Sequence, residues 1–217
     1  MATVRSPAGT RIFVQSAIAA SQAVTGISAA SPPVITYSGT DPSNGNYVAL
    51  TDMYGMTEFE DALVKVASVN GASNTFEAED QNSTGYGTFV SGNMSVVTMA
   101  TEISVGTGFS FTGFDQQFAE YALLKDKITR KFPTTVSAGG IEIPSIWDPA
   151  DAGLAALVAA GDSAEKLGFK ILFADGLEML FFGYIGASGM PRADNTNSIV
   201  TTNISVTMST RPRYVLP

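Results

Sequence analysis

The sequence predicts a mainly β protein with one flanking α-helix. Gly (21 residues), Ser, Thr and Val are abundant, whereas Lys and Glu are few, and this composition favours strands and tight turns over long helices. Short apolar runs alternate with turn clusters such as 41–45 (DPSNG) and 70–73 (NGAS). With 217 residues, of which 45% are hydrophobic and 15% charged, the chain is long enough to bury a substantial core.

The first half of the chain is expected to form one strand and then a small barrel. Residues 11–20 are predicted to be a strand, and the Pro32-Pro33 step ends this part because proline lacks the N–H that a central strand needs. Five short strands then follow between residues 34 and 91, which suggests a small barrel. They are predicted at 34–37, 47–50, 63–69, 75–79 and 87–90.

The second half is expected to form a sheet with one helix. A helix is predicted over 148–160, with Asp148 as its N-cap, Pro149 as its first residue and Gly161 at its end. Strands are predicted in the long β-type run 94–111 and then at 167–173, 177–185 and 197–209.

Residues 113–132 leave two interpretations open. Phe114, Phe118, Tyr121 and Leu124 fit one face of an amphipathic helix. The same apolar residues fit a long loop whose apolar side chains would pack against a neighbouring subunit.

The absence of His and Cys removes much chemistry. It excludes a Ser-His-Asp triad, a Cys-His pair, disulfides and the usual zinc sites. Carboxylate pairs such as Glu58/Glu60 and Asp148/Asp151 exist, but such spacings arise by chance. We therefore predict that the protein is not an enzyme, with no catalytic, cofactor-binding or metal-binding residues and no cofactor.

The net charge of −8 indicates how the chain would behave towards DNA. An acidic protein does not hold nucleic acid by phosphate neutralisation, although it could surround DNA without binding it tightly. No stretch is long and apolar enough to cross a bilayer, and 12–24 is interpreted as a strand rather than a signal core. The protein is therefore expected in the cytoplasm of the cell that makes it, without membrane contact.

The C-terminal third contains an ordered set of short strings. After the predicted helix come 169–176 (FKILFADG), 181–189 (FFGYIGASG) and a Thr/Val strand that ends at 211–212 (RP). Together with 8–14 (AGTRIFV) and 136–141 (VSAGGI), this order resembles the tail tube proteins of lambda-like, non-contractile phage tails.

The middle of the chain has a separate resemblance. The strings 55–58 (GMTE), 74–77 (NTFE) and 83–89 (STGYGTF) resemble a small β-barrel module common in phage virion proteins. The family's usual Asn-Gly-Arg after the Glu is replaced by 59–61 (FED) here. Two domains are thus expected. Residues 1–33 and 92–217 would form a discontinuous tail-tube scaffold of the β-sandwich or barrel type. Residues 34–91 would form an inserted barrel on its outer surface.

The tail-tube resemblance implies a structural virion protein. It implies hexameric rings of the same chain, stacked into a tube that conducts DNA into the host without binding it. It also implies contacts with tape measure, tail terminator and tail tip proteins, in a virion tail made in the host bacterial cytoplasm.

Two sets of residues are candidates for these roles. Contacts between subunits are expected at Tyr121, Leu124, Lys125, Lys127, Arg130, Lys131, Phe132, Arg211 and Arg213, because apolar and basic side chains would complement acidic patches on the next ring. An acidic tube wall would repel DNA phosphates. The candidates for that wall are the carboxylates Asp115, Glu120, Glu142 and Glu178.

Two alternative functions stay open at the level of sequence. The barrel could be a host-surface or carbohydrate adhesin that uses Tyr47, Tyr54, Tyr86 and Trp147 as contacts. The chain could also be the tube protein of a contractile tail or secretion machine.

Overall fold

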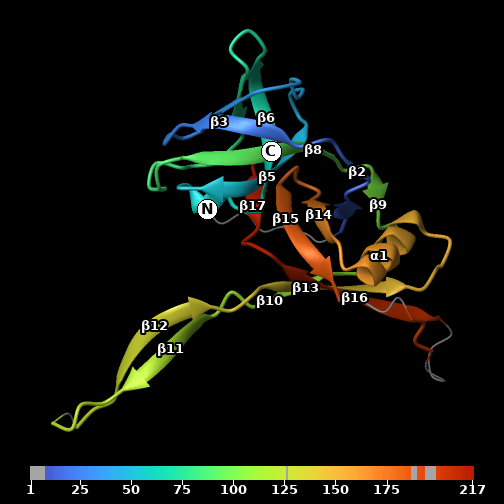
Figure 1. The fold of residues 1–217 in the computed structure, drawn as a ribbon. Helices are drawn as coiled ribbons and strands as arrows, with labels where there is room; N and C mark the ends of the chain where they lie inside the picture. The colour runs from blue at the N-terminus through green and yellow to red at the C-terminus, as the bar shows by residue number, and fades with distance from the viewer. Residues whose placement is uncertain (1–7, 126, 187–189, 194–198) are drawn as a thin grey trace.

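The structure, a computed structural model, describes residues 8–125, 127–186, 190–193 and 199–217. It is mainly β, with one α-helix in the described part of the chain, so the predicted fold class is confirmed. Figure 1 shows three parts: a closed barrel, a curved sheet that holds the helix, and a two-stranded arm that projects from the body.

The barrel closes because β8 pairs with strands on both of its sides. β8 (Ser91–Thr98) hydrogen-bonds to β3 on one side and to β5 on the other. The other barrel strands, in spatial order from β8, are β3 (Gln22–Ile27), β4 (Val34–Tyr37), β7 (Thr75–Ala78), β6 (Ala62–Asn70) and β5 (Tyr47–Tyr54). Two of the six strands, β3 and β8, therefore lie outside the interval 34–91.

Alternating apolar residues of these strands fill the barrel. Leu50 and Phe76 are completely buried inside it. So is Phe59, from the short 3-10 helix η1 (Thr57–Phe59) that follows β5. β2 (Ala17–Ile18) adds a short pairing to β8.

The curved sheet has eight antiparallel strands. Its spatial order is β10 (Ser110–Thr112), β13 (Gly140–Ile146), β16 (Thr201–Met208), β15 (Glu178–Ile185), β14 (Lys166–Leu172), β1 (Arg11–Val14) and β9 (Thr101–Glu102), with β17 (Arg213–Val215) paired to β15. One face of the sheet packs against the helix α1 (Ala152–Ser163).

The helix begins later than predicted. Its N-cap is Asp151, whose Oδ1 accepts the N–H of Leu154 at 2.8 Å, and not Asp148. Asp148 instead closes the preceding turn by accepting the N–H of Ala150. The helix also continues past Gly161 and ends where Ala164 adopts a left-handed conformation. Asp151 takes the cap because Ser104 also binds its carboxylate, a tertiary contact that the local sequence does not reveal.

A third hydrophobic core joins the barrel to the sheet. The barrel contributes Ala49, Leu63 and Val97, and the sheet contributes Leu180 and Phe182 among others. Strand β17 from the C-terminal segment adds Val215 to the same core. The barrel and the sheet thus share buried apolar area, in addition to the core that each has of its own.

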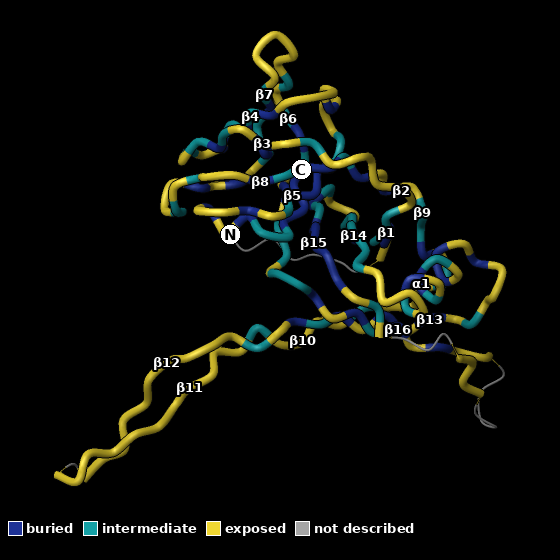
Figure 2. The backbone as a smooth tube through the Cα atoms, in the orientation of Figure 1, coloured by how far each residue is buried: buried dark blue, intermediate teal, exposed yellow. Residues whose placement is uncertain are grey.

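The arm consists of β11 (Gln116–Tyr121) and β12 (Arg130–Val136), paired only with each other. The helical interpretation of 113–132 is therefore wrong. Figure 2 shows both strands of the arm as exposed along their length, whereas most strands of the body alternate between buried and exposed residues.

Three other local predictions differ from the structure. Residues 87–90 are irregular and the strand begins at Ser91. The expected strand 11–20 is broken into β1 and β2, which join different sheets, and the run 94–111 is divided among β8, β9 and β10. In the part of the chain that the structure describes, no helix has the length and apolar character to span a membrane.

Candidate assembly surfaces

The arm presents apolar side chains that no described part of the same subunit covers. The exposed fraction of the residue is 56% for Phe118, 61% for Phe132 and 77% for Ile128, and Leu124 at the tip is fully exposed. A two-stranded hairpin without a third strand or a packed face is only marginally stable in water. The arm therefore has the properties of a segment that is stabilised by contact with another molecule.

Both faces of the arm carry such side chains. The pairs Ala119/Phe132 and Tyr121/Arg130 lie directly across the two strands and share one face, because cross-strand partners point to the same side. The other face carries Phe118 and the ion pair Glu120–Lys131, whose charged atoms are 2.8 Å apart. More than half of each side chain of this pair is exposed, so the pair contributes little to stability.

The predicted basic contact residues fall into two groups. Arg130 and Lys131 lie on β12, and Lys125 and Lys127 lie at the tip of the arm, so the arm brings four of them together with the apolar residues. Among the described residues, neither of the two tip lysines has a carboxylate partner.

The two C-terminal arginines lie elsewhere. Arg213 is engaged inside the subunit, since its guanidinium donates to Gln81 Oε1 at 2.9 Å and to the backbone oxygen of Glu58. The guanidinium of Arg211 lies 5.8 Å from the ring centroid of Phe114, near the base of the arm.

A second surface is a bare strip on the outer face of the curved sheet. The barrel covers this face at β14 and β15, but the strands β10, β13 and β16 are left open. Their outward side chains are mostly small and polar: Ser110, Thr112, Glu142, Asn203, Ser205 and Thr207. We call these six residues the polar strip. None of its three strands contains a lysine or arginine, and Glu142 is their only carboxylate.

The four predicted wall carboxylates are not brought together. Glu142 lies in the polar strip, and Glu120 lies on the arm. Asp115 lies where the arm joins the body, and its backbone N–H donates to the hydroxyl of Ser137. Glu178 lies at the junction between the barrel and the sheet, with a side chain that is only 13% exposed.

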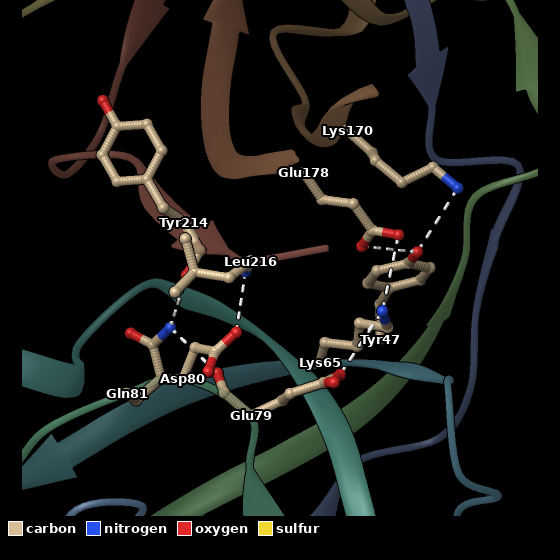
Figure 3. A network of polar contacts seen from close by, with 9 residues as sticks. All are labelled: Tyr47, Lys65, Glu79, Asp80, Gln81, Lys170, Glu178, Tyr214 and Leu216. Atoms are coloured by element: carbon tan, nitrogen blue, oxygen red, sulfur yellow. Dashed lines mark hydrogen bonds and ion pairs between the residues drawn. The ribbon is translucent and has the colours of Figure 1, made fainter. Parts of the chain in front are cut away.

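Glu178 belongs to a polar network that fastens the barrel to the sheet (Figure 3). It accepts the hydroxyl of Tyr47 at 3.0 Å and lies 3.5 Å from Lys65, and both partners come from barrel strands. Burial raises the pKa of Tyr47, and the adjacent Glu178 raises it further. Burial lowers the pKa of Lys170, whose ammonium donates to the Tyr47 hydroxyl.

The C-terminal segment makes a second set of hydrogen bonds to the barrel beside this network. Gln81 donates to the backbone oxygen of Tyr214 at 3.2 Å, and the N–H of Leu216 donates to Asp80 at 2.7 Å (Figure 3). These contacts hold the end of the chain against the barrel.

The residues considered for an enzyme or an adhesin are dispersed. Tyr47 lies in the junction, Tyr86 packs edge-on against Phe59 in the barrel, and Trp147 packs against the core of the sheet, so these aromatic side chains form no common surface with exposed Tyr54. Within the described ranges, no group of three or more acidic side chains is arranged to hold a metal ion.

The polar strip is the surface that the residue-by-residue prediction missed. A signal for it is present in the sequence, because Thr201, Asn203, Ser205 and Thr207 alternate with buried apolar or small residues. Alternation shows that a strand has one open face. It does not show that the neighbouring strand, β13, leaves the same face open.

Comparison with models of known protein families gives a match. The family model described as "Phage tail tube protein, TTP" matches residues 54–217. The matched range contains every strand of the curved sheet except β1, together with the helix, the arm and the barrel strands β6, β7 and β8. The search of curated proteins found no match.

Proposed function

Because the chain belongs to the phage tail tube protein family, we propose that it polymerises as stacked hexameric rings that conduct DNA into the host. Membership of this structural, non-enzymatic family makes the chain a component of the virion tail that self-assembles into the tail tube. The number of subunits in each ring, the stacking of the rings and the conduction of DNA are the parts that we propose.

The polar strip is the observation that carries the proposal. A tube needs a continuous wall of strands whose inner face tolerates DNA without binding it. The strip offers exposed hydroxyl and amide groups, one carboxylate and no basic side chain. Lys and Arg are the side chains that hold phosphates, so a wall of this kind allows DNA to slide.

The position of the barrel supports the same arrangement. In Figure 1, β10, β13 and β16 run along the side of the body opposite to the barrel. If the polar strip faces the lumen, the barrel projects outward. In this proposal residues 1–33 and 92–217 are the scaffold, and 34–91 are an insertion on the outer surface whose barrel is completed by β3 and β8 from the flanking segments.

The arm supplies contacts between subunits in the proposed tube. Its two apolar faces would be buried against other copies, which would remove the exposed area of Phe118, Phe132 and Ile128 from water. Tape measure, tail terminator and tail tip proteins would then meet the lumen and the two ends of the tube.

Cysteine labelling of assembled protein tests the direction of the strip. The chain has no cysteine, so Asn203→Cys in the strip and Ser73→Cys at an exposed barrel turn each provide one unique thiol. In rods seen by negative-stain electron microscopy, a bulky polyethylene glycol maleimide should modify Ser73→Cys and spare Asn203→Cys. Both variants should react equally as unassembled subunits.

Two results would contradict the proposal. One is equal modification of both thiols in intact rods. The other is a purified protein that forms neither rings nor rods at high concentration.

A further inference from the structure

Charge is segregated between the barrel and the arm. The barrel segment 22–98 contains eight acidic residues and one lysine, Lys65, which gives it a net charge of −7. The arm and its tip, 116–136, contain four basic and two acidic residues, which gives a net charge of +2. The barrel segment therefore carries a large excess of negative charge, and the arm carries a small excess of positive charge.

The barrel has a surface on which acidic and apolar groups occur together. Tyr54 is 64% exposed and Val90 is 71% exposed. They are neighbours, because the N–H of Val90 donates to the backbone oxygen of Tyr54 at 2.9 Å. Glu60 holds this end of β5 by accepting the N–H groups of Asp52 and Met53.

We define the barrel patch as Asp52, Tyr54, Glu60 and Val90. Exposed aromatic and aliphatic side chains bordered by carboxylates are the complement of the arm tip. The tip presents Leu124 and Ile128 beside Lys125 and Lys127.

We propose that the tip of the arm docks on the barrel patch of a neighbouring copy. Figure 1 shows the arm projecting away from the barrel of its own subunit, so the partner of this contact is a second copy of the chain. The inference rests on the proposed assembly into a tube, and it gives the barrel a role in holding subunits together. Apolar contact between Leu124, Ile128, Tyr54 and Val90 supplies most of the binding energy, and the charges select the orientation.

Mixed single-cysteine variants test the contact directly. Subunits with Leu124→Cys and subunits with Val90→Cys are combined, assembled and oxidised, and disulfide-linked dimers are measured by non-reducing gel electrophoresis. The pair should give at least a tenfold higher yield than the control pair of Leu124→Cys with Ser73→Cys. Each variant alone should give the background yield.

Charge reversal provides an independent measurement. Lys125→Glu with Lys127→Glu should slow rod growth, measured by light scattering, by about tenfold at low salt. Asp52→Lys in the same chain should restore part of the rate, whereas adding Lys at Ser73 should not.

The outcomes separate this inference from the proposed function. Rods that form without the disulfide between Leu124→Cys and Val90→Cys and without rescue by charge reversal would overturn the arm-to-barrel contact. Such rods would still support assembly into a tube. Absence of rings and rods from the unmodified protein would overturn both. A specific cross-link together with rescue would support the contact.

Discussion

Replacing Leu180 with alanine should destabilise the barrel and the curved sheet together, because its side chain lies in the core that they share. Leu180 is completely buried on β15, against barrel residues such as Ala49 and Leu63. Truncating a buried leucine typically costs about 2–5 kcal/mol, through lost burial and the cavity left behind. For a chain of this size, at roughly 2–4 °C per kcal/mol, that corresponds to a fall in Tm of roughly 4–20 °C.

Two matched substitutions show whether the chain unfolds as one unit. Leu50→Ala removes a leucine from the barrel core alone, and Leu157→Ala removes one from the core between the sheet and the helix. Both residues are as buried as Leu180. If the shared core couples the two parts, each variant lowers the midpoint of the same transition by a similar amount. Leu124→Ala at the exposed tip of the arm is the control and should change the free energy of unfolding by less than about 0.5 kcal/mol.

The single tryptophan makes the assay specific. Trp147 packs against the core of the sheet, so its fluorescence reports on the sheet, while far-ultraviolet circular dichroism reports on all strands. In dilute monomer, Leu50→Ala should shift the fluorescence transition although Leu50 lies in the barrel. Two separated transitions would refute the reasoning, with Leu50→Ala moving one and Leu157→Ala moving only the other.

Two further predictions concern the ends of the sheet and helix. Asp151→Ala should lower the free energy of unfolding by about 2 kcal/mol, because it removes the helix cap and the partner of Ser104. Asp148→Ala should lower it by about 0.5 kcal/mol or less. Urea unfolding of the two variants measures both values. Arg11 donates two hydrogen bonds to Glu102 and lowers the pKa of that carboxyl below its ordinary value of 4.5. A lowered pKa in the folded state contributes stability above the ordinary value and loses it as the pH falls through the folded value. Arg11→Gln should therefore flatten the loss of stability below about pH 4.5 in a thermal-unfolding series, and an unchanged acid slope would show that the pair has no such role.

Local patterns were sufficient for much of the fold. Strand β4 was predicted with its observed bounds, and β5, β6, β7, β14 and β15 were predicted to within a few residues. These strands have turn residues at both ends and apolar residues at regular spacing, so neighbouring residues alone define them.

Predictions failed where a distant partner decides the structure. The apolar spacing around Phe118 and Tyr121 suits a helix as well as a strand, and the pairing with β12 makes it a hairpin. Asp151 displaces Asp148 as the helix cap because Ser104, far away in the sequence, reaches its carboxylate. The surroundings of Arg213 also depend on distant residues, because Gln81 and Glu58 accept hydrogen bonds from its guanidinium; its contact with another subunit stays a prediction.

By itself, the sequence determined the composition of strands and turns, the absence of His and Cys, and the short strings that resemble tail tube proteins. These are properties of residues and their near neighbours. Only the tertiary structure decided that the barrel shares a core with the sheet, that the strands of the arm pair with each other and with no other described strand, and that three strands keep a polar face open. The physical reason is that burial depends on which strands become neighbours, and pairs such as β1 with β14 join residues more than 150 positions apart in the chain.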